Sequence, residues 1–196
     1  MPSARKFVVG LGNPGRQYRD TRHNVGFDVV GLLGQRWDLG QPAQRFNGWV
    51  LDGRIGPDAT PVTMLAPQTY MNRSGQAVRQ MVDFYKASPQ DVLVVMDDMA
   101  LEPGRLRFRL TGSAGGHNGL ADILRALGSD QVPRLRVGIG SAPGRMDPAD
   151  WVLGKFTAKE REIIDVAEQQ AADAVEDWLT APAENVMEKY NRRPEE

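Results

Sequence analysis

The sequence predicts an α/β fold, a single three-layer α/β/α domain around a mixed, mostly parallel twisted sheet. Three observations support this fold class. Segments with strand character alternate along the chain with segments of helical periodicity. The continuous apolar run VLVVM at residues 92–96 is typical of a central strand covered on both sides. The composition has no break, with 41% hydrophobic and 25% charged residues. We therefore expect one domain over residues 1–190 and a flexible tail over residues 191–196.

The first half of the chain predicts three strands and two helices. Val25, Val29 and Leu33 recur at helical spacing, so a helix follows the polar cluster Thr21-Arg-His-Asn24. A second helix carries apolar side chains at positions 78, 81, 82 and 85 and ends near Ser88-Pro89. Strands are predicted over residues 6–10, 49–55 and 61–66, and a Gly-Pro-Asp turn joins the last two.

The second half predicts further strands that carry arginines. Residues 105–110 alternate strictly, which places Arg105, Arg107 and Arg109 on one face of a strand. A strand over residues 135–139 has Arg134 and Arg136 on the face opposite its apolar side chains. For the glycine-rich loop 111–116 two interpretations stay open, a lid over a site or an ordinary connection. Helices are predicted over residues 120–127, 158–179 and 183–190.

The composition excludes several chemistries. The chain has no cysteine, so disulfides, thiolate metal sites and a cysteine nucleophile are ruled out. Its first residues contain too short an apolar run for a secretory signal, and no stretch is apolar enough to span a membrane. We therefore expect a cytoplasmic protein without a membrane partner.

Charge is distributed unevenly along the chain. Residues 103–146 contain seven arginines against two aspartates, whereas residues 160–178 contain seven acidic side chains against one arginine. The net charge of −1 can therefore conceal a basic surface that binds nucleic acid. The alternative is two ordinary solvated faces.

The stretch Gly10-Leu-Gly12-Asn-Pro-Gly15 has the spacing of a dinucleotide-binding loop. Such a loop needs a helix that starts at the third glycine, so that the helix N-terminus meets the pyrophosphate. Here no apolar stripe begins before Val25, and the segment before Asp38 has helical rather than strand character. The dinucleotide interpretation is therefore weak. The glycines more simply form a turn that presents Asn13 at the end of the sheet.

His23 is the candidate catalytic base. It follows a strand-end loop and precedes a helix, and ligands of open α/β sheets gather beside the carboxyl ends of strands. Histidine accepts protons near neutral pH and is commonly oriented by a carboxylate. Asp97 and Asp98 end the strand that starts at residue 92 and are the candidate partners. Two other interpretations stay open for this pair, solvated acids in a turn and a Mg²⁺ site.

Asparagines occupy junctions between the predicted elements. Helix capping is one explanation for these residues, because asparagine is a good cap. The other is that their uncharged donors and acceptors bind a peptide backbone or a developing oxyanion. No G-x-S-x-G motif is present, so water activated by His23 is a simpler nucleophile than a serine. The four residues are Asn13, Asn24, Asn72 and Asn118.

Long motifs in this chain resemble the bacterial peptidyl-tRNA hydrolase family over roughly residues 6–190. The first is Gly12-Asn-Pro-Gly-x-x-Tyr18-x-x-Thr21-Arg-His-Asn24-x-Gly26, and the second is Gly115-Gly-His-Asn118-Gly-Leu-x-Asp-Ile123. Thr69-Tyr-Met-Asn72-x-Ser-Gly75, the strand end at Asp97 and Arg134-Leu-Arg-x-Gly-Ile-Gly140 match further segments in the same order. The resemblance implies a catalytic domain over residues 1–190.

The resemblance also implies an activity and a set of site residues. The expected enzyme cleaves the ester between the C-terminus of a peptide and the ribose of tRNA, without a metal or an organic cofactor. This removes the Mg²⁺ interpretation. His23 corresponds to the base and Asp97 to its partner, and Asn13 joins them as a catalytic residue near the ester. The expected substrate-binding residues are Asn72, Asn118, Met71 and Tyr18.

Two departures from the family pattern concern the type of charged residue. Arg107 and Arg109 stand where lysines are common, and both residue types neutralise phosphate. Asp98 stands where glutamate is more usual, which leaves its role open. The expected tRNA phosphate contacts are Arg107, Arg109 and Arg136, with Arg134 and Arg145 as further candidates.

From these residues we expect direct hydrolysis by a monomer. His23 takes a proton from water, Asp97 stabilises the imidazolium, and a donor near Asn13 or Asn72 holds the oxyanion. The residues alone do not choose the tautomer of His23. The alternative function is a non-catalytic RNA-binding protein on the same fold.

Overall fold

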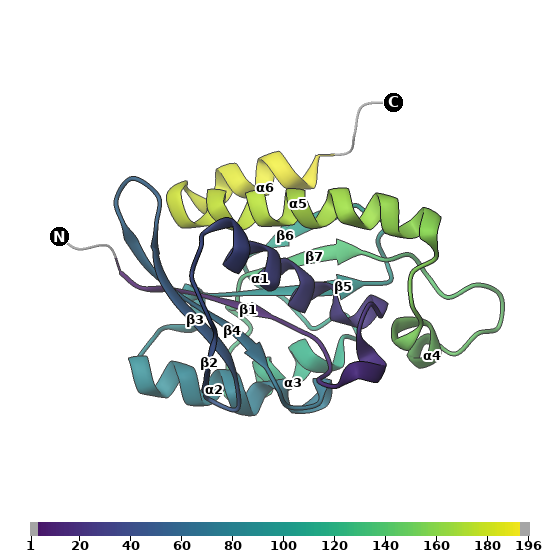
Figure 1. Ribbon diagram of the computed structural model, residues 1–196, viewed down its shortest axis with the longest axis horizontal. Helices are drawn as coiled ribbons and strands as arrows, with labels where there is room; N and C mark the ends of the chain where they lie inside the picture. Colours follow the sequence, from purple (N-terminus) through teal and green to yellow (C-terminus); the bar gives the residue numbers. More distant parts are fainter. Residues whose placement is uncertain (1–3, 193–196) are drawn as a thin grey trace.

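A seven-stranded sheet runs through the middle of the structure, a computed structural model that describes residues 4–192 (Figure 1). The strands are β1 (Lys6–Gly10), β2 (Ala43–Arg45), β3 (Gly48–Ile55), β4 (Thr60–Pro67), β5 (Val92–Asp98), β6 (Leu106–Arg109) and β7 (Arg134–Gly138). Their order is β2-β3-β4-β1-β5-β7-β6. The four central strands β4, β1, β5 and β7 pair in parallel. The pairs β2–β3, β3–β4 and β6–β7 are antiparallel. The predicted mixed sheet is confirmed, with its parallel part at the centre.

Helices cover both faces of the sheet, which confirms the predicted three layers (Figure 1). On one side lie α1 (Val25–Arg36), α5 (Ala158–Thr180) and α6 (Ala183–Asn191), and on the other lie α2 (Ser74–Tyr85) and α3 (Asn118–Leu127). The short α4 (Pro148–Leu153) stands apart, beyond the carboxyl ends of β5 and β7. Among residues 4–192, no helix combines the length and apolar character needed to cross a bilayer.

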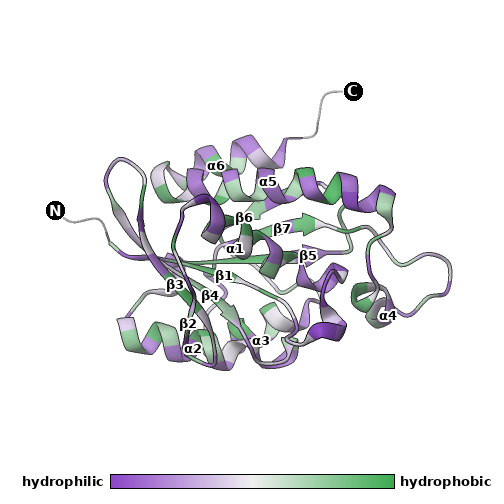
Figure 2. Ribbon diagram, viewed as in Figure 1, coloured by the Kyte–Doolittle hydropathy of each residue, from purple (hydrophilic) through white to green (hydrophobic). Residues whose placement is uncertain are grey.

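Strand β5 is buried along its whole length, because it separates two apolar cores. Leu93 and Val95 belong to the core under α1, α5 and α6, and Val94 and Met96 belong to the core under α2 and α3. Figure 2 shows the apolar residues gathered on the strands between the helical layers. Burying each such side chain contributes about 1.5–3 kcal/mol, so the strand end that carries Asp97 is firmly placed.

Gly10 and Gly26 allow strand β1 and helix α1 to pack closely. A Cβ on Gly10 would lie 2.2 Å from the carbonyl oxygen of Gly26, and a Cβ on Gly26 would lie 2.4 Å from the backbone nitrogen of Leu11. No long helix begins at Gly15, where a 3₁₀ turn covers only Arg16–Tyr18. The dinucleotide interpretation therefore fails on local geometry, and the glycines bring α1 against β1.

Several element boundaries differ from the predicted ones. Strand β6 starts one residue later and ends one residue earlier than predicted. Helix α2 stops at Tyr85 because Lys86 takes a left-handed φ of 53°. The sequence analysis missed β2 and α4, which are both short.

The C-terminal prediction needs one correction. Asn191, predicted as the start of a flexible tail, ends α6. Its side chain accepts from the N–H of Phe108 at 2.7 Å and donates to the carbonyl of Phe108 at 3.0 Å, which holds α6 against strand β6. Residues 193–196 of the predicted tail lie outside the described part of the chain.

Candidate active site

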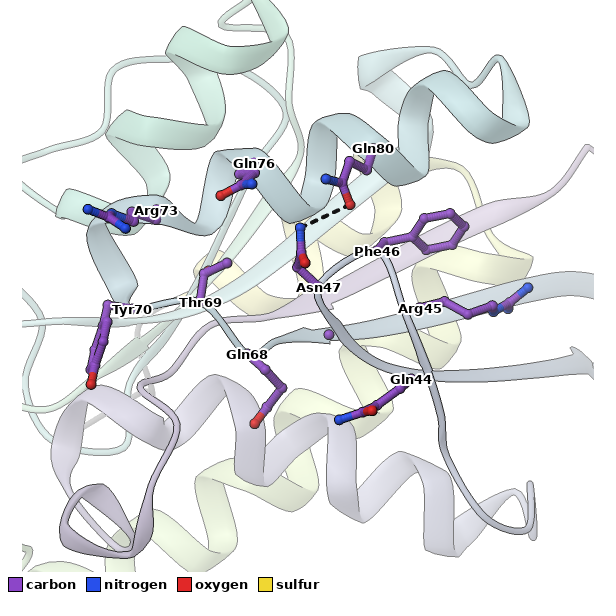
Figure 3. A pocket seen from close by; sticks show the side chains of 11 residues that line it. Gln44, Arg45, Phe46, Asn47, Gln68, Thr69, Tyr70, Arg73, Gln76 and Gln80 are labelled. Atoms are coloured by element: carbon purple, nitrogen blue, oxygen red, sulfur yellow. Dashed lines mark hydrogen bonds between the residues drawn. The ribbon is translucent and has the colours of Figure 1, made fainter.

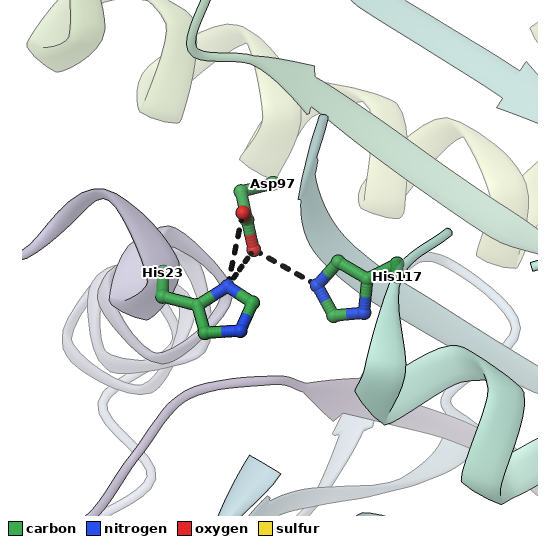
Figure 4. A group of neighbouring side chains, drawn as sticks. All are labelled: His23, Asp97 and His117. Atoms are coloured by element: carbon green, nitrogen blue, oxygen red, sulfur yellow. Dashed lines mark hydrogen bonds and ion pairs between the residues drawn. The ribbon is translucent and has the colours of Figure 1, made fainter. Parts of the chain in front are cut away.

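Asp97 binds two histidines at the carboxyl end of β5 (Figure 4). His23 Nδ1 lies 2.8 Å from Asp97 Oδ1 and 3.0 Å from Oδ2, and His117 Nε2 lies 2.9 Å from Oδ1. His23 comes from a 3₁₀ turn, Arg22–Asn24, that leads into α1, and His117 immediately precedes α3. All three side chains are buried. The predicted His23–Asp97 pair is therefore in contact, and His117 joins it.

The hydrogen bonds distinguish the two histidines. A carboxylate only accepts, so Nδ1 of His23 and Nε2 of His117 each donate to Asp97. His117 also accepts the backbone N–H of Leu120 at Nδ1, 3.2 Å away, so both of its ring nitrogens are used. In the described residues, Nε2 of His23 has no hydrogen-bond partner, and His23 lines a cavity. In this tautomer, Nε2 of His23 therefore carries a lone pair that is free to accept a proton.

Asp97 keeps its negative charge in spite of burial. Burial by itself raises the pKa of the Asp97 carboxyl, but the neighbouring imidazoles of His117 and His23 outweigh that effect and hold its pKa well below the usual range. A charged Asp97 fixes the imidazole orientation and can stabilise a positive charge that develops on His23.

A second network fixes the side-chain amide of Asn13. The backbone N–H of Met71 donates to Asn13 Oδ1 at 2.9 Å, across 58 residues of sequence. The side-chain amide of Asn24 binds the backbone of Asn13 twice, accepting its N–H at 2.8 Å and donating to its carbonyl at 3.0 Å. Because Oδ1 of Asn13 is occupied as an acceptor, Nδ2 is left to donate.

A cavity of about 420 Å³ opens beside these groups. Four of the predicted site residues line it, namely His23, Asp97, Asn118 and Arg136, and the α4 segment forms one of its walls. Its lining residues are His23, Met96, Asp97, Asp98, Met99, Ala100, Gly115, Gly116, His117, Asn118, Arg136, Asp147, Pro148, Ala149 and Val152.

The other predicted substrate-binding residues lie outside this lining. Met71 is buried, Asn72 is exposed in the short turn that leads into α2, and Tyr18 is half-buried in the loop after β1. Met71 nevertheless connects with the site through its N–H bond to Asn13.

A larger cavity of about 640 Å³ lies between the β2–β3 turn and α2 (Figure 3). Gln44, Gln68, Gln76 and Gln80 give it a polar lining, and neither histidine nor carboxylate contributes to it. This cavity therefore lacks a proton acceptor of the kind that His23 supplies, and the smaller cavity is the candidate active site.

Three predicted arginines gather near the cavity, on the edge strand β6 and its neighbour β7. Arg107 of β6 pairs in register with Arg136 of β7, and both are half-buried, as is Arg109. Burial, and then the positive charges of Arg107 and Arg136, lower the pKa of Arg109. In the described part of the chain no carboxylate pairs with Arg107 or Arg109. Such uncompensated cations suit an anionic partner.

Arg134 does not belong to this group, which corrects the sequence-based assignment. It is 2% exposed, and its guanidinium donates to the carbonyls of Val132, Gly112, Ser113 and Asp130. Its role is to hold the 111–116 loop against β7. Arg145, the remaining candidate, is exposed.

Asp97 and Asp98, the two carboxylates at the end of β5, bind different partners. Asp98 accepts from the N–H of Ala100 and forms an ion pair with Arg136 Nε at 2.9 Å, whereas Asp97 faces the histidines. The pair therefore does not converge on one cation, as the early Mg²⁺ interpretation required. The ligand atoms of His23, Asp97 and His117 do lie within 4.8 Å of one another, but a metal there would displace both protons that bind Asp97.

Sequence reasoning missed His117 and the partners of Asn13. His117 directly precedes Asn118 in the second family motif, in which the sequence assigns a role to Asn118 alone, and its position before a helix resembles a simple cap. The signal that identifies it is its place at the carboxyl end of the sheet, which requires the fold.

A buried carboxylate that orients an imidazole toward a cavity, at the carboxyl ends of parallel strands, is an arrangement suited to an enzyme that uses acid–base catalysis. The profile of the family described as "Peptidyl-tRNA hydrolase" matches residues 7–196. The peptidyl-tRNA hydrolase of Rhodopirellula baltica is 48% identical over 95% of this chain and 97% of its own length, and that of Geobacillus kaustophilus is 44% identical over 95% and 99%.

A solved structure agrees with these sequence matches. The crystal structure of peptidyl-tRNA hydrolase from Acinetobacter baumannii superposes with a TM-score of 0.89 at 35% identity, covering 95% of this chain and 94% of that one. The chain belongs to the peptidyl-tRNA hydrolase family and is an enzyme of that class. The resemblance noted in the sequence is confirmed.

Proposed function

We propose that the enzyme cleaves the ester of peptidyl-tRNA by direct attack of water, with Nε2 of His23 as the general base. The observation that carries this proposal is the asymmetry of the two histidines. Asp97 holds Nδ1 of His23 and leaves Nε2 open, whereas both nitrogens of His117 are engaged. Water activated at Nε2 attacks the ester carbonyl.

His23 then carries the proton until it passes to the leaving group. The imidazolium that forms on His23 is stabilised by the charged Asp97, which stays ionised. The tetrahedral intermediate collapses, the ester C–O bond breaks, and the ribose oxygen takes the proton from Nε2 of His23. Free tRNA and a peptide with a carboxylate terminus leave the site.

Asn13 is the proposed donor to the oxyanion. The N–H of Met71 holds Oδ1 of Asn13 and the side chain of Asn24 holds its backbone, which leaves Nδ2 to donate. A donor held before the reaction needs no reorganisation, and such a donor typically contributes about 10²–10³ in rate.

The remaining assignments concern the substrate. Asn118 lines the cavity and is proposed to bind the peptide near the ester. Asn72, Tyr18 and Met71 are proposed to contact parts of the substrate beyond the reacting bond. Arg107, Arg109 and Arg136 are proposed to bind tRNA phosphates, since they supply unpaired or half-exposed positive charge beside the cavity.

We also propose that the enzyme works as a cytoplasmic monomer without a metal or an organic cofactor. The residues above supply a base, an orienting acid and an oxyanion donor, which is a complete set for ester hydrolysis. The alternative of an RNA-binding protein without activity is disfavoured by membership of an enzyme family and by the retained His23–Asp97 pair.

Release of N-acetyl-amino acid from N-acetyl-aminoacyl-tRNA in the presence of EDTA tests this function. The parent protein is expected to cleave, and His23→Gln is expected to lose about 10²–10⁴ in kcat while it still binds tRNA. A parent that binds tRNA but does not cleave would overturn the assignment of roles.

A further inference from the structure

We propose that Arg22 is a positioning residue that holds α4 against the catalytic cavity and thereby sets the affinity for peptidyl-tRNA. This inference rests on the proposed function of the site. Arg22 precedes His23 in the chain, yet its side chain binds Trp151 of α4 and Glu160 of α5.

The guanidinium of Arg22 is buried at 4% exposure and binds the start of α5. Nη2 donates to both carboxylate oxygens of Glu160, at 3.0 and 2.8 Å. Glu160 in turn accepts from the backbone N–H of Thr157 at 2.7 Å as part of the cap of α5. Although burial opposes it, these hydrogen bonds lower the pKa of Glu160, so the pair remains charged at neutral pH.

The same side chain also binds α4 and the residue after it. The guanidinium carbon lies 3.5 Å from the ring centre of Trp151, and Nη1 donates to the carbonyl of Trp151 at 3.4 Å. The backbone N–H of Arg22 donates to the carbonyl of Gly154 at 3.0 Å. A Cβ on Gly154 would lie 2.9 Å from Nη1, so a side chain at this position would shift the guanidinium.

Helix α4 has little else to hold it. It is six residues long, and none of its residues is buried. The indole N–H of Trp151 donates to the carbonyl of Gly140 at 2.8 Å, which ties the helix to the end of β7. Beside the backbone bridge between Thr21 and Lys155, Arg22 therefore supplies the main side-chain link between α4 and the turn Arg22–Asn24. A helix without its own apolar anchor depends on such contacts for its position.

The position of α4 matters because it forms one wall of the active site. Pro148, Ala149 and Val152 line the cavity opposite His23 and His117. His23 is held separately by its two contacts with Asp97. Loosening α4 thus removes a binding surface while the base stays in place, which raises KM more than it lowers kcat.

Lysine cannot replace arginine in this role. Its ammonium lacks the planar fork that places Nη2 on Glu160 and Nη1 on the carbonyl of Trp151 at the same time, and it lacks the flat face that stacks on Trp151. Arg22→Lys therefore keeps the buried positive charge and removes the geometry. Arg36→Lys is the matched control, because Arg36 also joins α1 to acids of α5, pairing with Asp173 at 2.7 Å, but does not contact α4.

The experiment measures steady-state kinetics on N-acetyl-aminoacyl-tRNA together with amide hydrogen exchange. Arg22→Lys is expected to raise KM by about fivefold to tenfold with kcat within about twofold, less than the roughly hundredfold cost of a misplaced reacting group. Exchange is expected to accelerate over residues 147–155 and to stay unchanged in β5. Arg36→Lys is expected to change neither readout.

A second variant, Trp151→Leu, leaves the buried charge pair intact but removes both the stacking partner of Arg22 and the indole bond to Gly140, so it is expected to raise KM at least as much. Unchanged KM and unchanged exchange at 147–155 in both variants would overturn the proposal, as would uniformly faster exchange throughout the protein. Because exchange does not require turnover, failure of the parent to cleave substrate would refute the proposed function without deciding the role of Arg22 in holding α4.

Discussion

At the scale of single residues, one aspartate gives two histidines different duties. Asp97 binds both rings, but His117 has a second partner in the Leu120 N–H and His23 does not. The sequence could predict that His23 meets Asp97 or Asp98, because strand ends and pre-helix loops meet at one edge of an α/β sheet, and the family resemblance selected Asp97. It could not predict the tautomers, because these depend on contacts made by His117 and Leu120 after folding.

The amide of Asn13 provides a sharp test of the oxyanion assignment. Asn13→Asp keeps an acceptor for the N–H of Met71 but has no donor at the second position. We expect kcat to fall by about 10²–10³ while KM changes little, since the donor acts in the transition state. A matched change, Asn47→Asp beside the other cavity, is expected to leave kcat unaltered. A variant Asn13→Asp with near-parent kcat would exclude this residue as the donor.

At the scale of elements, the strands and long helices follow from periodicity, whereas α4 does not. Alternation in residues 105–110 and the apolar run of β5 are local signals. Helix α4 has six residues and no buried side chain, so its position depends on Arg22 and Gly140, which are distant in sequence. The same reason hid the role of Arg134, whose partners are backbone carbonyls that no residue pattern encodes.

Packing of α1 on α5 places Asp28 in an acidic cluster. Burial, and then the charge of Glu168, raise the pKa of Asp28 to about 7. Folded protein therefore keeps a proton that the unfolded chain releases near its ordinary pKa of about 3.9, and stability falls as pH rises from about 4 to 7. Asp28→Asn is expected to remove this slope, so that its melting temperature exceeds the parent's at pH 8 but not at pH 4. Thermal melts across that range would show it.

Asp83→Asn, an exposed change on α2, serves as the control for that measurement, because among the described residues Asp83 forms an ion pair with the exposed Arg79 alone. Equal pH slopes for the parent and Asp28→Asn would contradict a raised pKa at Asp28.

At the scale of the whole molecule, the sheet order separates opposite charges. The arginines of β6 and β7 lie at one edge of the sheet near the cavity, and the acidic side chains of α5 pair with Arg36, Arg161 and Lys189 on one helical layer. The uneven charge seen in the sequence therefore becomes a local basic surface despite a net charge of −1. The sequence indicated this charge division, but the fold was needed to remove Arg134 from it.

This surface predicts salt-dependent tRNA binding. The double variant Arg107→Ala, Arg109→Ala is expected to weaken binding and to lower the slope of log K against log salt by about 1 for each lost phosphate contact. Arg79→Ala, on the distant α2 helix, is expected to leave the slope unchanged. Titration of labelled tRNA at several salt concentrations measures it, and a slope equal to the parent's would exclude these two arginines from phosphate binding.

The central claim is that His23, and not His117, is the general base. The most direct test compares kcat for His23→Ala and His117→Ala with N-acetyl-aminoacyl-tRNA under saturating conditions. We expect His23→Ala to lose about 10²–10⁴ in kcat and His117→Ala to lose markedly less, since it only helps to orient Asp97. A larger loss in His117→Ala, with His23→Ala close to the parent, would contradict the assignment of the base.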